Sequence, residues 1–175
     1  MALAIDRYGP SLIKQYLAMA KSSLCHAEQM NNDGFAEKAL INGALWQLAE
    51  ALKWHLILAL ATEQRDPWIK RDCSDVVQGF TAQLSKSPGS DNACELLQLI
   101  SEQGSWLQQL AQLISTLSMT PSVFNEQQDH QFRDVIATTQ SRGRYWSQQT
   151  VEYYVSAHSA LSELIHRHFD AAIEN

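Results

Sequence analysis

Apolar residues recur every three or four positions along four long stretches of this chain. An α-helix with a single apolar face has that period, so each stretch predicts an amphipathic helix. A shorter stretch at about 74–84 has the same period. Gly9 and Pro10 predict the start of the first helix, because proline is tolerated in a first helical turn. We expect the long helices at about 10–30, 35–62, 91–120 and 144–172.

These elements predict an all-α fold, in which neighbouring helices hide each apolar stripe. The expected architecture is an antiparallel bundle of four long helices with a short extra helix. A chain of 175 residues has the length of one ordinary domain, so residues 1–175 are expected to form a single helical-bundle domain. Segment 119–143 has no clear period and is expected to be one long irregular connection, whose structure the sequence leaves open.

The stretch 40–61, LINGALWQLAEALKWHLILALA, has the length of a membrane span. Its five polar side chains would cost more in hydrocarbon than its leucines offset, so we expect a bundle helix instead. His55 falls among the apolar positions and is expected to be buried. Trp46 and Trp54 fall beside Glu50 in the polar half of the helix. These three residues form either a second packing face of a central helix or an exposed surface for a partner.

The balance of charged residues limits the classes of function open to the chain. Its net charge of −6 opposes a large nucleic-acid footprint, which needs a concentrated positive face. A local anion-binding patch remains an alternative. Arg142 and Arg144 lie at the start of a predicted helix, where backbone N–H groups also favour anions. We take this pair as the candidate anion-binding site. The alternative is that both arginines pair with neighbouring carboxylates.

The cysteines and histidines form no recognisable metal motif. Three cysteines without a C-x-x-C spacing indicate reduced thiols in a cytoplasmic protein, rather than disulfides or a zinc site. Glu163 and His166 have the spacing of one di-iron ligand pair, but they face away from the apolar stripe and no second such pair exists in the sequence. His55, His158 and His168 are candidate buried polar residues, which either meet in one site or are unrelated within the core. We expect no metal and no cofactor.

Two resemblances arise at the first two predicted helices. The segments YGPSLIKQYLAMAKSSLCHAE and AEKALINGALWQLAEALKWHLILAL are similar to the opening helical hairpin of an uncharacterised proteobacterial domain-of-unknown-function family of small all-helical proteins, over roughly the first third of the chain. This likeness implies a bacterial origin and brings no catalytic residues. The architecture also resembles HEPN-type bundles, which occur as RNA-cutting toxins and as partners of nucleotidyltransferases. Their nuclease signature, an arginine followed four to six residues later by a histidine, does not occur in this sequence.

The sequence favours a non-enzymatic, cytoplasmic helical bundle that acts through protein–protein interaction, as a homodimer or an adaptor. Trp46, Glu50 and Trp54 are its expected interaction surface, and no membrane contact is expected. One alternative is a HEPN-like bundle associated with nucleic acid or nucleotides through Arg142 and Arg144. The other alternative is a metal-binding bundle enzyme with ligands from the inward-facing histidines.

Overall fold

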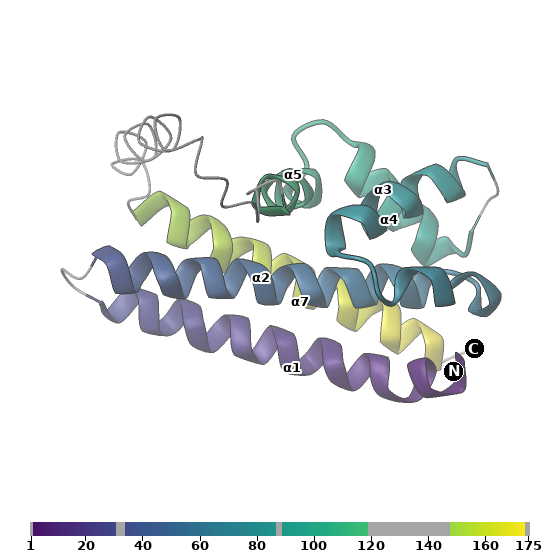
Figure 1. Ribbon diagram of the computed structural model, residues 1–175, viewed down its shortest axis with the longest axis horizontal. Coiled ribbons are helices and arrows are strands. Elements are labelled where there is room, and N and C mark those ends of the chain that lie inside the picture. Colours follow the sequence, from purple (N-terminus) through teal and green to yellow (C-terminus); the bar gives the residue numbers. More distant parts are fainter. Residues whose placement is uncertain (1, 31–33, 87–88, 119–147, 174–175) are drawn as a thin grey trace, which may run out of the picture.

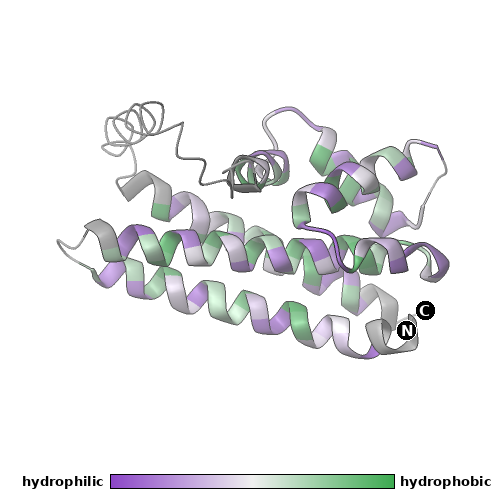
Figure 2. Ribbon diagram, in the orientation of Figure 1, coloured by the Kyte–Doolittle hydropathy of each residue, from purple (hydrophilic) through white to green (hydrophobic). Residues whose placement is uncertain are grey.

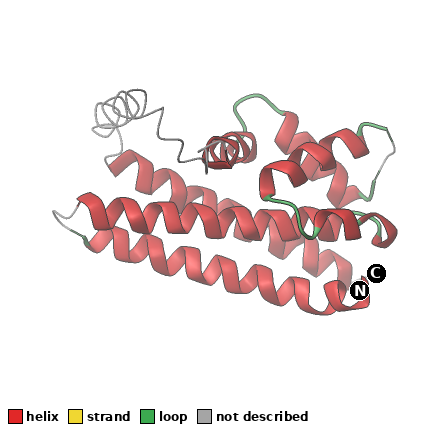
Figure 3. Ribbon diagram, in the orientation of Figure 1, coloured by secondary structure: helices red, strands yellow, loops and turns green. Residues whose placement is uncertain are grey.

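The computed structural model describes residues 2–30, 34–86, 89–118 and 148–173. Within these ranges every regular element is a helix, which confirms the predicted all-α class (Figure 3). The predicted irregular connection at 119–143 lies outside the described residues. Among the helices that are described, none is both long enough and apolar enough to cross a membrane.

Three long helices form the body of the described fold. α1 (Ala2–Gln29) and α2 (Gly34–Ala59) lie side by side and run antiparallel, and α7 (Gln148–Ile173) packs against both of them (Figure 1). α7 runs in the same direction as α2. As a result α1 begins, and α2 and α7 end, at the same end of the molecule.

Shorter helices pack over the C-terminal half of α2, on the side away from α1 (Figure 1). They are α3 (Cys73–Leu84), α4 (Asp91–Ser101) and α5 (Trp106–Ser118). Two 3₁₀ turns, η1 (Thr62–Gln64) and η2 (Asp66–Trp68), lead from α2 into α3. The ring of Trp68 packs on Gly79 of α3 so closely that a Cβ atom added there would overlap it.

The apolar faces of all these α-helices meet in one core. Green and purple segments alternate along α1, as expected for a helix with one buried side (Figure 2). α2 is different, because its neighbouring residues Leu56 and Ile57 are both fully buried although they point in different directions. α2 is therefore the central helix and packs on more than one side.

Over residues 91–120 the structure differs from the prediction. The expected single long helix is two helices, α4 and α5, so the predicted bundle of four long helices is not confirmed. Gly104 between them has φ 83°, a backbone conformation that glycine adopts readily and that interrupts a helix. The Ser105 hydroxyl then caps α5 by accepting a hydrogen bond from the Gln108 backbone N–H at 3.0 Å. The apolar period continues across this break, which is why periodicity alone predicts one helix.

The ends of the first two helices also differ from the prediction. α1 begins at Ala2, so Pro10 lies inside the helix instead of at its start. α2 ends at Ala59, where the side chain of Arg65 turns back onto the helix end. Its Nε donates to the backbone oxygen of Leu60 and its Nη2 to that of Leu58, both at 2.8 Å. These bonds satisfy carbonyl groups that a helix end leaves without partners.

Candidate functional site

The clearest exposed apolar surface of the described chain follows one side of α1. Tyr8, Met19 and Met30 are all exposed and lie eleven residues apart. Eleven residues make about three helical turns, so Tyr8 and Met19 lie nearly in line on α1, and Met30 directly follows the end of the helix at Gln29. Half-buried Leu12 and Tyr16 lie on the same side.

Trp46 of α2 extends this surface. Its side chain is 56% exposed, and its ring meets the ring of Tyr16 edge to face, with centroids 6.1 Å apart. Burying such exposed aromatic surface is a strong source of binding free energy in protein interfaces. We call this surface the α1 band and define it by Tyr8, Leu12, Tyr16, Met19, Met30 and Trp46.

The α1 band contains no formally charged side chain. The remaining exposed positions on that side of α1 are serine, glutamine and His26. The charged residues of α1 lie on the other sides of the helix. Lys21 and Glu28, for example, line a groove against α7. Arg7 lies at the rim, 5.6 Å from the centre of the Tyr8 ring. An uncharged, partly apolar strip bordered by charge is typical of the core and rim of a protein interface.

The predicted surface of Trp46, Glu50 and Trp54 is not a single open patch. Trp54 is half-buried and packs against the core. Glu50 is also half-buried, and its Oε2 lies 3.4 Å from Nζ of Lys53, which is itself buried. Of the three predicted residues, Trp46 is the exposed one, and its apolar surface continues onto α1.

The histidines form a second feature, at the end of the molecule where α2 and α7 finish. His55 and His168 are 3% and 4% exposed, and His55 Nε2 lies 2.9 Å from His168 Nδ1. The other ring nitrogen of His168, Nε2, lies 3.0 Å from Glu95 Oε2 of α4. Arg167 Nη2 donates to the remaining oxygen of Glu95 at 2.9 Å. We call these three hydrogen-bonded residues, Glu95, His168 and His55, the relay.

The partners in the relay determine where its protons lie. An ionised carboxylate only accepts hydrogen bonds, so Nε2 of His168 donates to Glu95. This hydrogen bond from His168 is the main cause of a lowered pKa at Glu95. In the neutral state of both rings, Nδ1 of His168 then accepts the proton of His55 Nε2. Nδ1 of His55 is left with a lone pair and no proton.

His55 is held neutral by its surroundings. Burial, and secondly the neighbouring His168, lower the pKa of His55 from 6.5 to about 3, while Glu95 opposes this shift. Nδ1 of His55 is buried and lacks a hydrogen-bond partner. Among the described residues, no other buried side-chain nitrogen or oxygen lacks one. Such atoms are uncommon in folded proteins, where nearly all buried polar groups are paired.

His158 does not join the other two histidines. It is half-buried on α7 and faces α1, where its Nε2 lies 3.0 Å from the backbone oxygen of Leu17. Arg142 and Arg144, the candidate anion-binding pair, lie outside the described residues. No sequence motif links Glu95 to a histidine 73 residues away, so its place beside His168 could not be predicted from the sequence.

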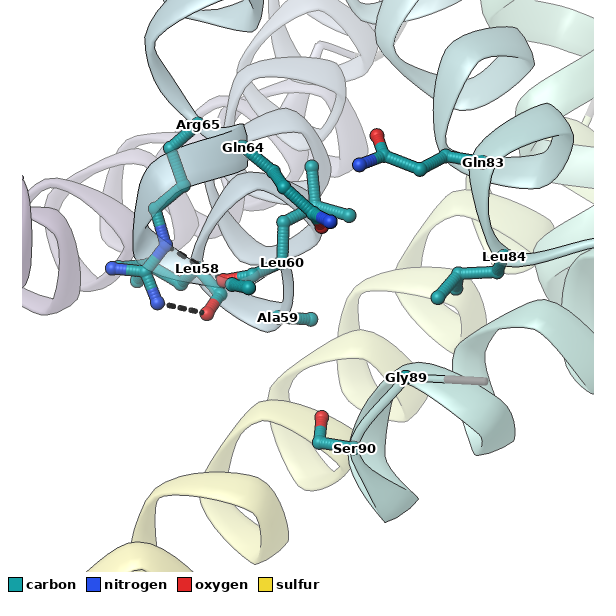
Figure 4. Close-up of a pocket in the computed structure, with 10 residues that line it drawn as sticks. Leu58, Ala59, Leu60, Gln64, Arg65, Gln83, Leu84, Gly89 and Ser90 are labelled. Atoms are coloured by element: carbon teal, nitrogen blue, oxygen red, sulfur yellow. Dashed lines mark hydrogen bonds between the residues drawn. The ribbon is translucent and has the colours of Figure 1, made fainter. Parts of the chain in front are cut away.

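A small pocket opens beside the relay. It has a volume of about 230 Å³ and is lined by residues of four helices, namely Pro10, His55, Leu58, Ala59, Ser90, Asn92, His168 and Phe169. A larger pocket of about 420 Å³ adjoins it and shares Leu58, Ala59 and Ser90. Figure 4 shows the larger pocket, with Ser90 across from Ala59 and with Arg65 bonded to the end of α2.

The described side chains do not assemble a metal centre. Within the described ranges no three His, Cys, Asp or Glu side chains converge as metal ligands would. Glu163 and His166 are both exposed on α7. Apart from His55 Nδ1, the ring nitrogens of the relay are hydrogen-bonded: His55 Nε2 and His168 Nδ1 to each other, and His168 Nε2 to Glu95.

No protein-family model matches this chain, and neither a curated protein nor a solved structure is similar enough to count as a match.

Proposed function

We propose that this protein acts through protein–protein association and forms a homodimer by pairing two α1 bands. The observation that carries the proposal is the line of exposed Tyr8, Met19 and Met30, extended by Trp46, on a side of α1 without charged residues. Exposed apolar strips of this kind on a folded domain mark interaction surfaces.

If the partner is a second copy of the chain, the charges favour the α1 band as the face that pairs. Each chain carries a net charge of −6, so two copies repel one another over most of their surfaces. A two-fold dimer brings the same face of both copies together. If that face were charged, like charges would lie opposite each other. On the α1 band that repulsion is weakest, and apolar burial is favourable there.

The geometry of the band also predicts where the two-fold axis lies. Met19 is midway between Tyr8 and Met30. If two α1 helices pair antiparallel along the band, each Met19 lies close to the Met19 of the other copy. A charge introduced at this position therefore meets the same charge in the partner.

Met19→Lys tests the proposal directly. We expect the variant to dimerise more than about 100-fold more weakly than the natural chain, because facing like charges in an interface cost several kcal/mol. Ala18→Lys is the matched control, since Ala18 is also exposed but lies on the charged side of α1; it should dimerise normally. Sedimentation velocity over a range of concentrations measures both dissociation constants, and circular dichroism verifies that helicity is kept.

Mixing variants of opposite charge distinguishes a homodimer from other partners. Met19→Glu alone should also be monomeric, whereas an equal mixture of Met19→Glu and Met19→Lys should recover dimers, because unlike charges then face each other. A natural chain that stays monomeric at high concentration would overturn the homodimer. If Ala18→Lys weakens dimerisation as much as Met19→Lys does, the α1 band is not the dimer interface.

A further inference from the structure

The larger of the two pockets near the end of α2 lies where three helices begin or end. Its described lining comes from the end of α2 and the turn that follows it, from the last turn of α3 and from the start of α4. Its volume of about 420 Å³ exceeds the roughly 150 Å³ cavity in which a benzene-sized molecule binds, and is typical of ligand pockets. A molecule with one or two rings therefore fits the space.

Hydrogen bonds and close packing fix the walls of this pocket. The two bonds from Arg65 to carbonyl groups at the end of α2 hold the following turn against that helix. Near the start of α4, Gly89 lies so close to Leu84 that a Cβ atom added to the glycine would come within 2.6 Å of the leucine Cδ2. Ser90 then caps α4, because its hydroxyl accepts a hydrogen bond from the Ala93 backbone N–H at 3.3 Å. These contacts form the pocket without help from a ligand.

Two glutamine side chains supply the polar groups of the pocket that are available to a ligand. Gln64 and Gln83 are half-buried, and Figure 4 shows their amide ends extending into the pocket from opposite sides. Their backbones are held in place, since Gln64 N–H donates to the Ala61 oxygen at 2.9 Å and Lys86 N–H to the Gln83 oxygen at 3.1 Å. Within the described ranges, neither side-chain amide forms a hydrogen bond with the protein. Each amide therefore offers a ligand one oxygen acceptor and two N–H donors.

The rest of the lining favours a neutral ligand. Leu58, Leu60 and Leu84 supply apolar walls. The guanidinium of Arg65 is directed at the end of α2, where the negative end of the helix dipole offsets its charge (Figure 4). Among the described residues that line the pocket there is no carboxylate, so a cation gains no partner of opposite charge there.

We propose that this pocket binds a small, neutral, planar molecule that presents a hydrogen-bond donor beside an acceptor, as a primary carboxamide or a nucleobase does, and that Gln64 and Gln83 hold that group between them. A carboxamide has two donors and two acceptor lone pairs, so it can bond to two glutamines at once. Glutamine side chains also form paired hydrogen bonds with adenine. The ring of the ligand packs against the leucine walls. The site contains no residue of the α1 band and does not depend on dimer formation.

Benzamide and acetophenone are the matched probes for this site. They have nearly the same shape, and only benzamide brings N–H donors. We expect benzamide to bind at least about tenfold more tightly, because acetophenone loses the hydrogen bonds to the glutamine oxygens. Titrations followed by ¹H–¹⁵N NMR measure both affinities, and benzamide should shift the side-chain NH₂ resonances of Gln64 and Gln83.

Adenine and purine form a second matched pair, since purine lacks the amino group of adenine. We expect adenine to bind more tightly than purine for the same reason. If benzamide binds more tightly than adenine, the pocket is a carboxamide site, and the reverse order makes it a nucleobase site.

Substitutions of glutamine by methionine locate the binding. Methionine has nearly the same length and no amide, so Gln64→Met and Gln83→Met should each weaken benzamide binding about tenfold and leave acetophenone binding nearly unchanged. Gln78→Met is the control, because Gln78 is exposed on α3 and does not line the pocket. This variant should bind both probes as the natural chain does.

Three results would overturn the proposal. If benzamide binds no more tightly than acetophenone, and adenine no more tightly than purine, the glutamines do not select the ligand. If Gln64→Met and Gln83→Met both keep the affinity of the natural chain, the probes bind elsewhere. An absence of saturable binding by all four probes would show that the pocket is not a site for this class of ligand. The NH₂ resonances test the contact in the natural chain, even if a variant fails to fold.

Discussion

Replacing His55 with glutamine should remove part of the sensitivity of the fold to mild acid. In the native protein the pKa of His55 is about 3, mainly because of burial, whereas in the unfolded chain it returns to 6.5. At a pH between these two pKa values, His55 is protonated in the unfolded chain and neutral in the native protein. The free energy of unfolding therefore falls as the pH falls through this window. Glutamine does not titrate, so the variant lacks this contribution.

The size of the effect follows from the same pKa values. Each pH unit below 6.5 removes about 1.4 kcal/mol of stability until the native pKa is reached. From about pH 7.5 to about pH 5 the natural chain should lose about 2 kcal/mol more than His55→Gln. Glu95 adds little in this range, because its own contribution is lost only as the pH falls below its unfolded pKa of 4.5.

Urea unfolding, followed by circular dichroism at a series of pH values, measures this difference. His166→Gln is the control, because His166 lies exposed on the same helix as His168. It should keep the full pH dependence of the natural chain. Parallel curves for the natural chain and His55→Gln would refute the reasoning, since they would mean that His55 binds protons equally in the native and unfolded states.

Other predictions test packing and burial elsewhere in the fold. Gly79→Ala should cost about 1–3 kcal/mol, because its methyl group overlaps the tryptophan ring packed there. Gly43→Ala, with nothing within 4 Å of the new atom, should instead stabilise α2 by about 0.5–1 kcal/mol; thermal unfolding of both variants checks the contrast, and equal stabilities would contradict it. Cys73 is buried and its pKa is raised to about 12 by that burial, so in the native protein it should resist alkylation while exposed Cys25 and Cys94 react. Mass spectrometry counts the labels, and three labels without denaturant would contradict this expectation.

Local patterns in the sequence predict much of the helical structure. The apolar period and the turn residues indicate α2 and α7 to within a few residues, because both are local properties of the chain. The break at Gly104 is less visible. A single glycine within a continuing apolar period lowers helix stability without showing that the backbone changes direction there.

The candidate sites are harder to predict, because they depend on which helices become neighbours. Periodicity places His55, His158 and His168 towards the interior alike, yet only two of them meet. The third relay residue, Glu95, lies on α4, whose docking against α7 cannot be deduced from its own sequence. In the same way, the sequence places Trp54 on the polar side of its helix, whereas Trp54 packs against the core because α2 has neighbours on several sides.

The contact between His55 and His168 also limits the order in which the fold is completed during synthesis. α1 and α2 are consecutive and can pair as soon as both have left the ribosome. The side of α2 that α7 covers, including His55, stays exposed until Gln148 and the residues after it are made. At ordinary translation rates that interval is roughly 5–20 s. During this time the nascent hairpin presents an open apolar face, which is the kind of surface that chaperones bind.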